Sequence, residues 1–174
     1  MTEKNPDPEI EPRADRPHMP GYGILDANSG KGLFPWSWAV ERLEKTRSYW
    51  IATTRPDGAP HAMPVWGLWI DGALYFSTGK ESRKARNLAA NPRCVIGCGS
   101  GGDEAVVMEG VVEEIQQPSA SLLRQFFDAY KAKYQWDMDS MDQDAGPIFK
   151  VCPKVVFGLS TGLAESATRW RFDE

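Results

Sequence analysis

The chain has few of the residues on which disulfide-stapled or metal-bound folds depend. Only three of its 174 residues are cysteines and two are histidines. A low, odd cysteine count excludes a disulfide framework and is typical of a reducing compartment, so we expect a cytoplasmic protein. The histidines, cysteines and carboxylates show no metal-ligand spacing, and no metal site is expected.

A strong charge of one sign and long apolar runs are also lacking. Lys and Arg number 20 against 24 Asp and Glu, which gives a net charge of −4. A protein that binds nucleic acid by neutralising its phosphates is therefore not expected. No apolar stretch approaches the roughly 20 residues of a membrane helix, and the polar N-terminus does not read as a secretory signal, so no membrane association is expected.

What is present suffices for one domain that follows a polar arm. A hydrophobic fraction of 41% over this length supports a single core. The first 20 residues carry almost nothing apolar, and such a segment cannot offset its ordering entropy. We therefore predict a disordered or draped arm over residues 1–34 and a folded domain over residues 35–174. The prolines that interrupt the arm are Pro6, Pro8, Pro12, Pro17 and Pro20.

Hydrophobic periodicity predicts that the domain is mainly β. Apolar residues at helical spacing favour three helices, at residues 36–45, 82–90 and 118–134. Short β-rich runs separated by turn sequences favour strands at residues 49–54, 60–70, 73–78, 94–98, 105–115 and 155–159. A short segment at 168–172 closes the chain. The pattern indicates an α+β protein dominated by a six-stranded antiparallel barrel with peripheral helices.

One segment places hydroxyl and cationic side chains where a strand is followed by a helix. Ser77 and Thr78 end the predicted strand, and Ser82 is a suitable N-cap. Unpaired backbone N–H groups at a helix N-terminus bind anions. Arg83 and Lys84 in the first turn oppose the helix dipole, a conflict that a bound phosphate removes. A solvated basic face explains the same spacing equally well.

The strand before that segment contains Pro64, which donates no ladder hydrogen bond. Either this strand lies at a sheet edge, or its backbone faces something other than a strand, such as the polar edge of a flat heteroaromatic ring. Both interpretations stay open from the residues alone, because His61 and Trp66 have ordinary structural roles available to them.

These stretches resemble a known superfamily. Residues 50–61 (WIATTRPDGAPH), 64–66 (PVW), 75–78 (YFST) and 82–88 (SRKARNL) are similar to the pyridoxamine 5'-phosphate oxidase-like split-barrel superfamily. The similarity is greater to its flavin/deazaflavin oxidoreductase branch, which often uses coenzyme F420. The resemblance covers about residues 36–174. It implies a split β-barrel homodimer with the cofactor in a groove between the two chains.

The resemblance also implies site residues by position. It places five residues along the flavin or deazaflavin ring, two near the ribityl-phosphate, and three on the phosphate with Asn87 nearby. Two more, in the closing strand, line the pocket from the partner chain. In that order the residues are His61, Met63, Pro64, Val65 and Trp66; Ser77 and Thr78; Ser82, Arg83 and Lys84; and Arg169 and Trp170.

Two departures from the oxidases proper bear on the cofactor. His61 stands where those oxidases carry an arginine, and Ala105 where they carry a flavin-contacting glutamine. We therefore expect F420 rather than FMN, and we do not expect oxidation of vitamin B6.

The function implied by the resemblance is an F420H2-dependent oxidoreductase that delivers a hydride to an electron-poor C=C or C=N bond of a small substrate. Solvent or a pocket hydroxyl can protonate the product, so no catalytic residue is named. One alternative is an FMN-dependent pyridoxamine 5'-phosphate oxidase-like oxidase or reductase. The other is a non-enzymatic carrier of flavin, F420 or haem, for which His61 is the available haem ligand.

Overall fold

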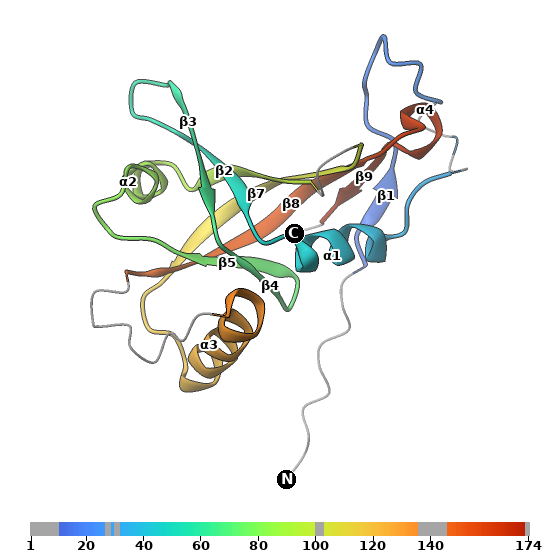
Figure 1. Ribbon diagram of the computed structural model, residues 1–174. Helices are drawn as coiled ribbons and strands as arrows, with labels where there is room; N and C mark the ends of the chain where they lie inside the picture. The colour runs from blue at the N-terminus through green and yellow to red at the C-terminus, as the bar shows by residue number, and fades with distance from the viewer. Residues whose placement is uncertain (1–10, 27–28, 30–31, 100–102, 136–145, 173–174) are drawn as a thin grey trace.

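A computed structural model of the chain describes residues 11–26, 29, 32–99, 103–135 and 146–172. Its described residues form nine strands, all antiparallel, and four helices (Figure 1). The strands are β1 (Arg13–Asp15), β2 (Tyr49–Thr54), β3 (Pro60–Val65), β4 (Leu68–Ile70), β5 (Ala73–Ser77), β6 (Arg93–Cys98), β7 (Ala105–Ile115), β8 (Ile148–Leu159) and β9 (Thr168–Arg171). The helices are α1 (Trp36–Lys45), α2 (Arg83–Ala90), α3 (Ala120–Tyr134) and α4 (Leu163–Ser166).

The sheet follows the order β1-β9-β8-β7-β6-β2-β3, and the β4–β5 hairpin joins it through β8. Strand β8 carries this arrangement because its two halves have different partners. Its first half pairs with β5 and its second half with β9, while β7 runs along nearly its whole length. The long β7–β8 pair crosses the molecule as a diagonal in Figure 1.

The predicted count of six strands is wrong for the described part of the chain, for two reasons. The expected strand at 60–70 is two strands, β3 and β4, because the chain turns at Gly67. A Cβ there would lie 3.2 Å from the Tyr75 carbonyl oxygen and 3.3 Å from a Leu74 methyl group. In addition, β1 and β9 have only three and four residues, too few to show an alternating pattern.

Strand β8 is also longer than the predicted strand at 155–159. Its first half contains Pro153, a residue that argues against a central strand. The register between β7 and β8 shifts between Glu109 and Gly110, so that Lys154 has no opposite residue. A bulge of this kind accommodates a proline inside a sheet.

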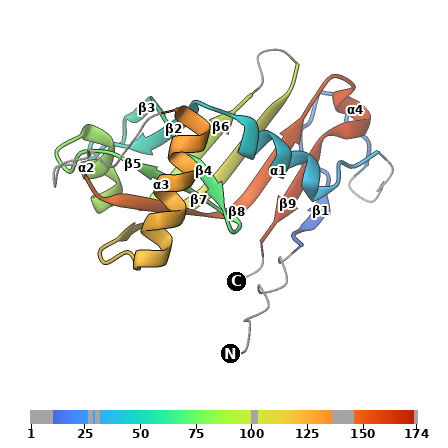
Figure 2. The ribbon, with the colours of Figure 1, turned by 60° about the horizontal axis from the view of Figure 1, so that its bottom comes forward.

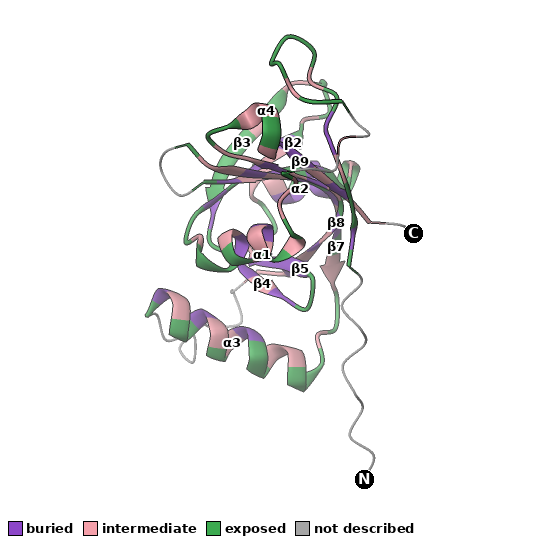
Figure 3. Cartoon of the chain, turned by 90° about the vertical axis from the view of Figure 1, so that its right-hand side faces the viewer, coloured by how far each residue is buried: buried purple, intermediate pink, exposed green. Residues whose placement is uncertain are grey.

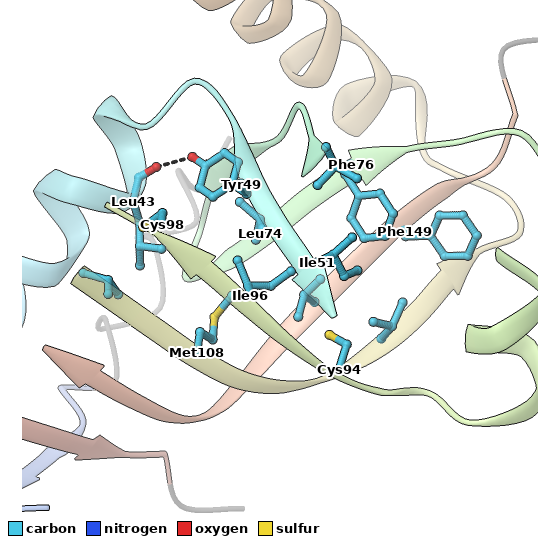
Figure 4. Close-up of a cluster of buried hydrophobic side chains, with 14 of the residues drawn as sticks. Leu43, Tyr49, Ile51, Leu74, Phe76, Cys94, Ile96, Cys98, Met108 and Phe149 are labelled. Carbon is cyan, nitrogen blue, oxygen red and sulfur yellow. Dashed lines mark hydrogen bonds between the residues drawn. The ribbon is translucent and has the colours of Figure 1, made fainter. Parts of the chain in front are cut away.

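The three predicted helices are confirmed as α1, α2 and α3, each within two residues of the expected ends. Helix α1 buries Ala39 and Leu43 in the main core, which the β2, β5, β6, β7 and β8 side chains fill (Figure 4). Helix α3 packs a second cluster, including Phe126 and Tyr130, against β4 and β5 and exposes its other side (Figure 3). No described helix is long and apolar enough to cross a membrane.

Part of the segment predicted as a disordered or draped arm is packed against the sheet. Strand β1 pairs with β9, and Arg16 is 1% exposed. The Arg16 guanidinium donates to the carbonyl oxygens of Ser29, Glu165 and Ala167 at 2.9, 2.7 and 3.4 Å. This segment and the β9 end of the sheet lie together in Figure 2. Residues 1–10 lie outside the described residues, and the domain boundary at residue 34 stays a prediction.

Candidate functional site

The junction between β5 and α2 brings three of the predicted phosphate residues together. Ser82 caps α2, and its Oγ accepts a hydrogen bond from the Ala85 N–H at 3.2 Å. Thr78 Oγ1 lies 3.2 Å from Ser82 Oγ, and Lys84 Nζ donates to Thr78 Oγ1 at 3.1 Å. We call Thr78, Ser82 and Lys84 the Lys84 cluster. Its three polar groups converge at the N-terminus of α2, where the backbone N–H groups point outward.

The charge of Lys84 has no carboxylate partner among the described residues. Lys84 is partly buried, and among the described residues its only partner is the neutral hydroxyl of Thr78. Burial lowers the pKa of Lys84, with no carboxylate to oppose the shift. The first turn of α2 contains no acidic residue, and it also carries the exposed Arg83. The N-terminus of α2 and the side chains of Arg83 and Lys84 therefore form one positively charged region.

Two residues predicted beside the phosphate lie elsewhere. The Ser77 side chain donates to the Gly146 carbonyl oxygen at 3.5 Å and lines a cavity of about 280 Å³ beneath α3. Successive strand residues point to opposite faces, so Ser77 faces α3 while Thr78 faces the cluster. Asn87 is 1% exposed and donates to Thr53 Oγ1 on β2 at 3.0 Å, so its side chain points into the sheet.

Strand β3, which carries the predicted ring contacts, lies at the end of the strand order. The mid-strand Pro64 is therefore tolerated, because one backbone edge of β3 pairs with no described strand. His61 and Met63 are opposite the buried Thr53 and Ile51, but His61 is only half-buried and Met63 is 44% exposed. Pro64, with the opposite orientation, pairs with the exposed Trp50.

Trp66, the last of the predicted ring contacts, packs against helix α3. Val65 is buried in the main core, whereas Trp66 is 43% exposed. The Trp66 ring stacks on Tyr134 of α3, with centroids 4.8 Å apart and an interplanar angle of 7°. The Tyr134 hydroxyl lies 2.9 Å from the Gly67 N–H and 2.8 Å from the Gly67 carbonyl oxygen, which fixes the corner after Trp66.

The structure does not bring the closing strand to the Lys84 cluster within one chain. Three strands, β8, β7 and β6, lie between β9 and β2. Arg169 forms an ion pair with Asp15 at 2.7 Å, and Trp170 is 1% exposed within the main core. The Trp170 ring fits over Gly158, where any Cβ would lie 2.6 Å from it.

Sequence reasoning did not single out the residues beneath the site. Lys133 Nζ donates to the Tyr49 hydroxyl at 2.9 Å and to the Gly67 carbonyl oxygen at 3.0 Å. Burial, together with the charge of Arg47, lowers the pKa of Lys133 to about 8. Tyr134 and Lys133 lie at the end of α3. Tyr134 continues the buried stripe of Phe126 and Tyr130, and this helical spacing was the signal in the sequence that could have identified it.

These features define a class of protein: a small antiparallel β protein with a positively charged helix N-terminus beside an exposed edge strand. The family model described as pyridoxamine 5'-phosphate oxidase matches residues 39–159, more than half of the chain. The chain therefore belongs to the pyridoxamine 5'-phosphate oxidase family, whose members bind flavin. No curated protein matches the chain.

Solved structures with the same fold have differing functions. An F420 reductase is 24% identical, with a TM-score of 0.54 over 67% of this chain and 93% of its own. A conserved hypothetical protein of Mycobacterium tuberculosis is 22% identical, with a TM-score of 0.62 over 75% of this chain and 88% of its own. The haem storage protein HutZ of Vibrio cholerae is 16% identical, with a TM-score of 0.60 over 71% and 93%. At these identities the likeness concerns the fold.

Proposed function

We propose that the protein is an F420H2-dependent oxidoreductase that reduces an electron-poor C=C or C=N bond of a small substrate. The observation that carries the proposal is the Lys84 cluster. A partly buried ammonium group whose one described partner is a neutral hydroxyl is stabilised when an anion binds it. A phosphate bound there also accepts hydrogen bonds from the N-terminus of α2.

The ring of the cofactor is proposed to lie along β3. Its edge offers backbone N–H and C=O groups that no described strand uses, and such groups suit the polar edge of a flat heteroaromatic ring. When bound, the reduced cofactor supplies the hydride. The chain orients the ring and holds the phosphate, while solvent supplies the proton.

The functional unit is proposed to be a homodimer with the cofactor between the chains. The outer face of β2, β3 and β6 supports this, because it leaves Trp50 57% and Val95 37% exposed. In the register, Trp50 lies beside Pro64 and Gly97, so these residues form one flat apolar patch. Large exposed apolar patches mark protein interfaces. The Trp50→Glu variant is expected to sediment as a monomer in analytical ultracentrifugation, whereas a wild-type monomer would contradict the proposed dimer.

The phosphate assignment is tested by titrating wild type and Lys84→Ala with F420 and with FMN. A charge-assisted contact contributes about 1.5–3 kcal/mol, so Lys84→Ala is expected to bind about 10- to 100-fold more weakly. Arg86→Ala, which removes an exposed cation two residues further along α2, is the matched control and should bind as wild type does. Equal binding by wild type and Lys84→Ala would show that the phosphate lies elsewhere.

The same titration separates the alternatives. Tight binding of F420 with turnover of an acceptor supports the proposal, and a clear preference for FMN supports the FMN-dependent alternative. Stoichiometric binding without turnover points to a carrier. Haem binding that is lost in His61→Ala would favour the haem-binding function.

A further inference from the structure

Three polar side chains meet between helix α2 and the β2–β3 hairpin, behind the proposed ring site. Asn87 and Thr53 are 1% and 3% exposed. Asn87 Nδ2 lies 3.0 Å from Thr53 Oγ1, and Thr53 Oγ1 lies 3.3 Å from the His61 carbonyl oxygen. Thr53 and His61 are directly opposite in the register, so their side chains are neighbours on one face of the sheet.

Counting donors fixes the orientation of the Asn87 amide. A threonine hydroxyl has one hydrogen. The Thr53 hydroxyl donates that hydrogen to the His61 carbonyl oxygen, and it must therefore accept from Asn87. The group that Asn87 turns toward Thr53 is thus the NH₂ group, and its Oδ1 remains an acceptor.

Two buried atoms in this cluster lack a hydrogen-bond partner among the described residues: Asn87 Oδ1 and His61 Nδ1. A buried acceptor without a donor is unfavourable, because it has lost its hydrogen bonds to water and gained none in the protein. His61 is directly opposite Thr53 in the register, so its imidazole lies on the same face of the sheet as the Thr53 hydroxyl that Asn87 contacts. No hydrogen bond joins Asn87 Oδ1 and His61 Nδ1 in the described structure.

We propose that Asn87 is a positioning residue that sets the tautomer of His61, with hydrogen on Nδ1 and the lone pair on Nε2. In the proposed arrangement the imidazole rotates so that its Nδ1 donates to Asn87 Oδ1, two atoms that have no hydrogen-bond partner in the described structure. Nε2 then lies on the partly exposed side of the ring. His61 then accepts a hydrogen bond from its ligand. The site therefore selects rings that present an N–H or O–H donor toward β3. This inference rests on the proposed ring site for its function, whereas the tautomer is a property of the protein alone.

Nitrogen-15 NMR of the histidine side chains, at about pH 9 where imidazoles are neutral, tests the assignment. The chain has two histidines, and the exposed His18 is the internal reference. Wild-type His61 is expected to be mainly the Nδ1–H tautomer. In Asn87→Leu the ratio of Nδ1–H to Nε2–H should fall about tenfold, as expected for the loss of one buried hydrogen bond. Asn87→Asp keeps an acceptor oxygen and should retain the Nδ1–H form.

A wild-type His61 that is mainly Nε2–H overturns the proposal, because Nδ1 is then an acceptor. An unchanged tautomer ratio in a folded Asn87→Leu overturns it too. If Asn87→Leu does not fold, the wild-type and Asn87→Asp spectra decide. Titration of the same samples with F420 and FMN keeps the two proposals separate. An Nδ1–H tautomer in a protein that binds neither ring refutes the proposed function only, and ring binding by an Nε2–H protein refutes the tautomer assignment only.

Discussion

The charged side chains at the two ends of the sheet have different kinds of partner. At the β1–β9 end, Asp15 forms ion pairs with Arg169 and Arg171 at 2.7 and 2.8 Å, and the buried Arg16 donates to three carbonyl oxygens. At the α2 end, Lys84 contacts only the neutral Thr78 hydroxyl among the described residues. We infer that the charged groups at the β1–β9 end stabilise the fold, whereas Lys84 at the α2 end binds a ligand. Substitutions at the two ends should therefore separate stability from binding.

Arg16 is expected to have the largest effect on stability. Arg16→Met removes the buried donor that three carbonyl oxygens share, which should lower the free energy of unfolding by about 3–5 kcal/mol. Urea unfolding measures the change. Arg13→Met, which alters an exposed arginine of the adjoining strand β1, is the control and should change stability by less than about 0.5 kcal/mol. Equal effects of the two substitutions would mean that burial of Arg16 does not stabilise the β1–β9 end.

Asp15 is expected to have a smaller and pH-dependent effect. Burial raises its pKa, but the Arg169 hydrogen bond and the charges of Arg169, Arg171 and Arg13 together hold the pKa below its ordinary value of 3.8. A carboxyl group with a lowered folded pKa stabilises the protein above about pH 4, and this contribution disappears as the pH falls through the folded pKa. Asp15→Asn should therefore lose about 1–2 kcal/mol at pH 7 and less near pH 2. A loss that is equal at both pH values would contradict the ion-pair explanation.

Lys133 extends the comparison to a cation under the proposed site. Its folded pKa is about 8, below the ordinary 10.5, so the folded state releases the proton before the unfolded state does. The free energy of unfolding should therefore rise between about pH 8 and 10.5, by about 1 kcal/mol from pH 7.5 to 9.5 after screening by solvent. Urea unfolding at those two pH values should show this rise in wild type and not in Lys133→Met. A rise of the same size in both proteins would assign it to other groups.

Lys84 is expected to have the smallest effect on stability. Burial lowers its pKa, so the fold disfavours the charged form, and removing the charge relieves that penalty. Lys84→Met should stay within about 0.5 kcal/mol of wild type or be slightly more stable. If Lys84→Met were clearly less stable than wild type in urea, Lys84 would stabilise the fold as the charges of the β1–β9 end do. The proposed difference between the two ends would then be wrong.

Local sequence patterns predicted the helices well and the strands less completely. Ser82 and the stripe of α3 mark helices that need no distant partner to be recognised. The first half of β8 was missed because Pro153 reads as a strand breaker, and only the bulge against β7 shows how it is accommodated. Strand β1 was missed because three residues have no period of their own and form a strand only by pairing with β9.

The candidate site was predicted unevenly for the same reason. Thr78, Ser82 and Lys84 are neighbours in sequence, and the structure brings them together at the end of α2. Ser77 and Asn87 are equally close in sequence, but strand alternation and helix periodicity turn them to other partners. Their partners, Gly146 before β8 and Thr53 on β2, belong to distant parts of the chain.

The sequence by itself determined the class of fold and the position of a cationic, hydroxyl-rich helix start, because turns, caps and apolar periods are local. The tertiary structure alone decided which of those charges are neutralised. Asp15 meets Arg169 across 154 positions of sequence, whereas the one partner of Lys84 in the described part of the chain is a hydroxyl six residues away. The energy of a charge in a protein depends on what the folded chain places beside it, and that arrangement is set by the pairing of strands.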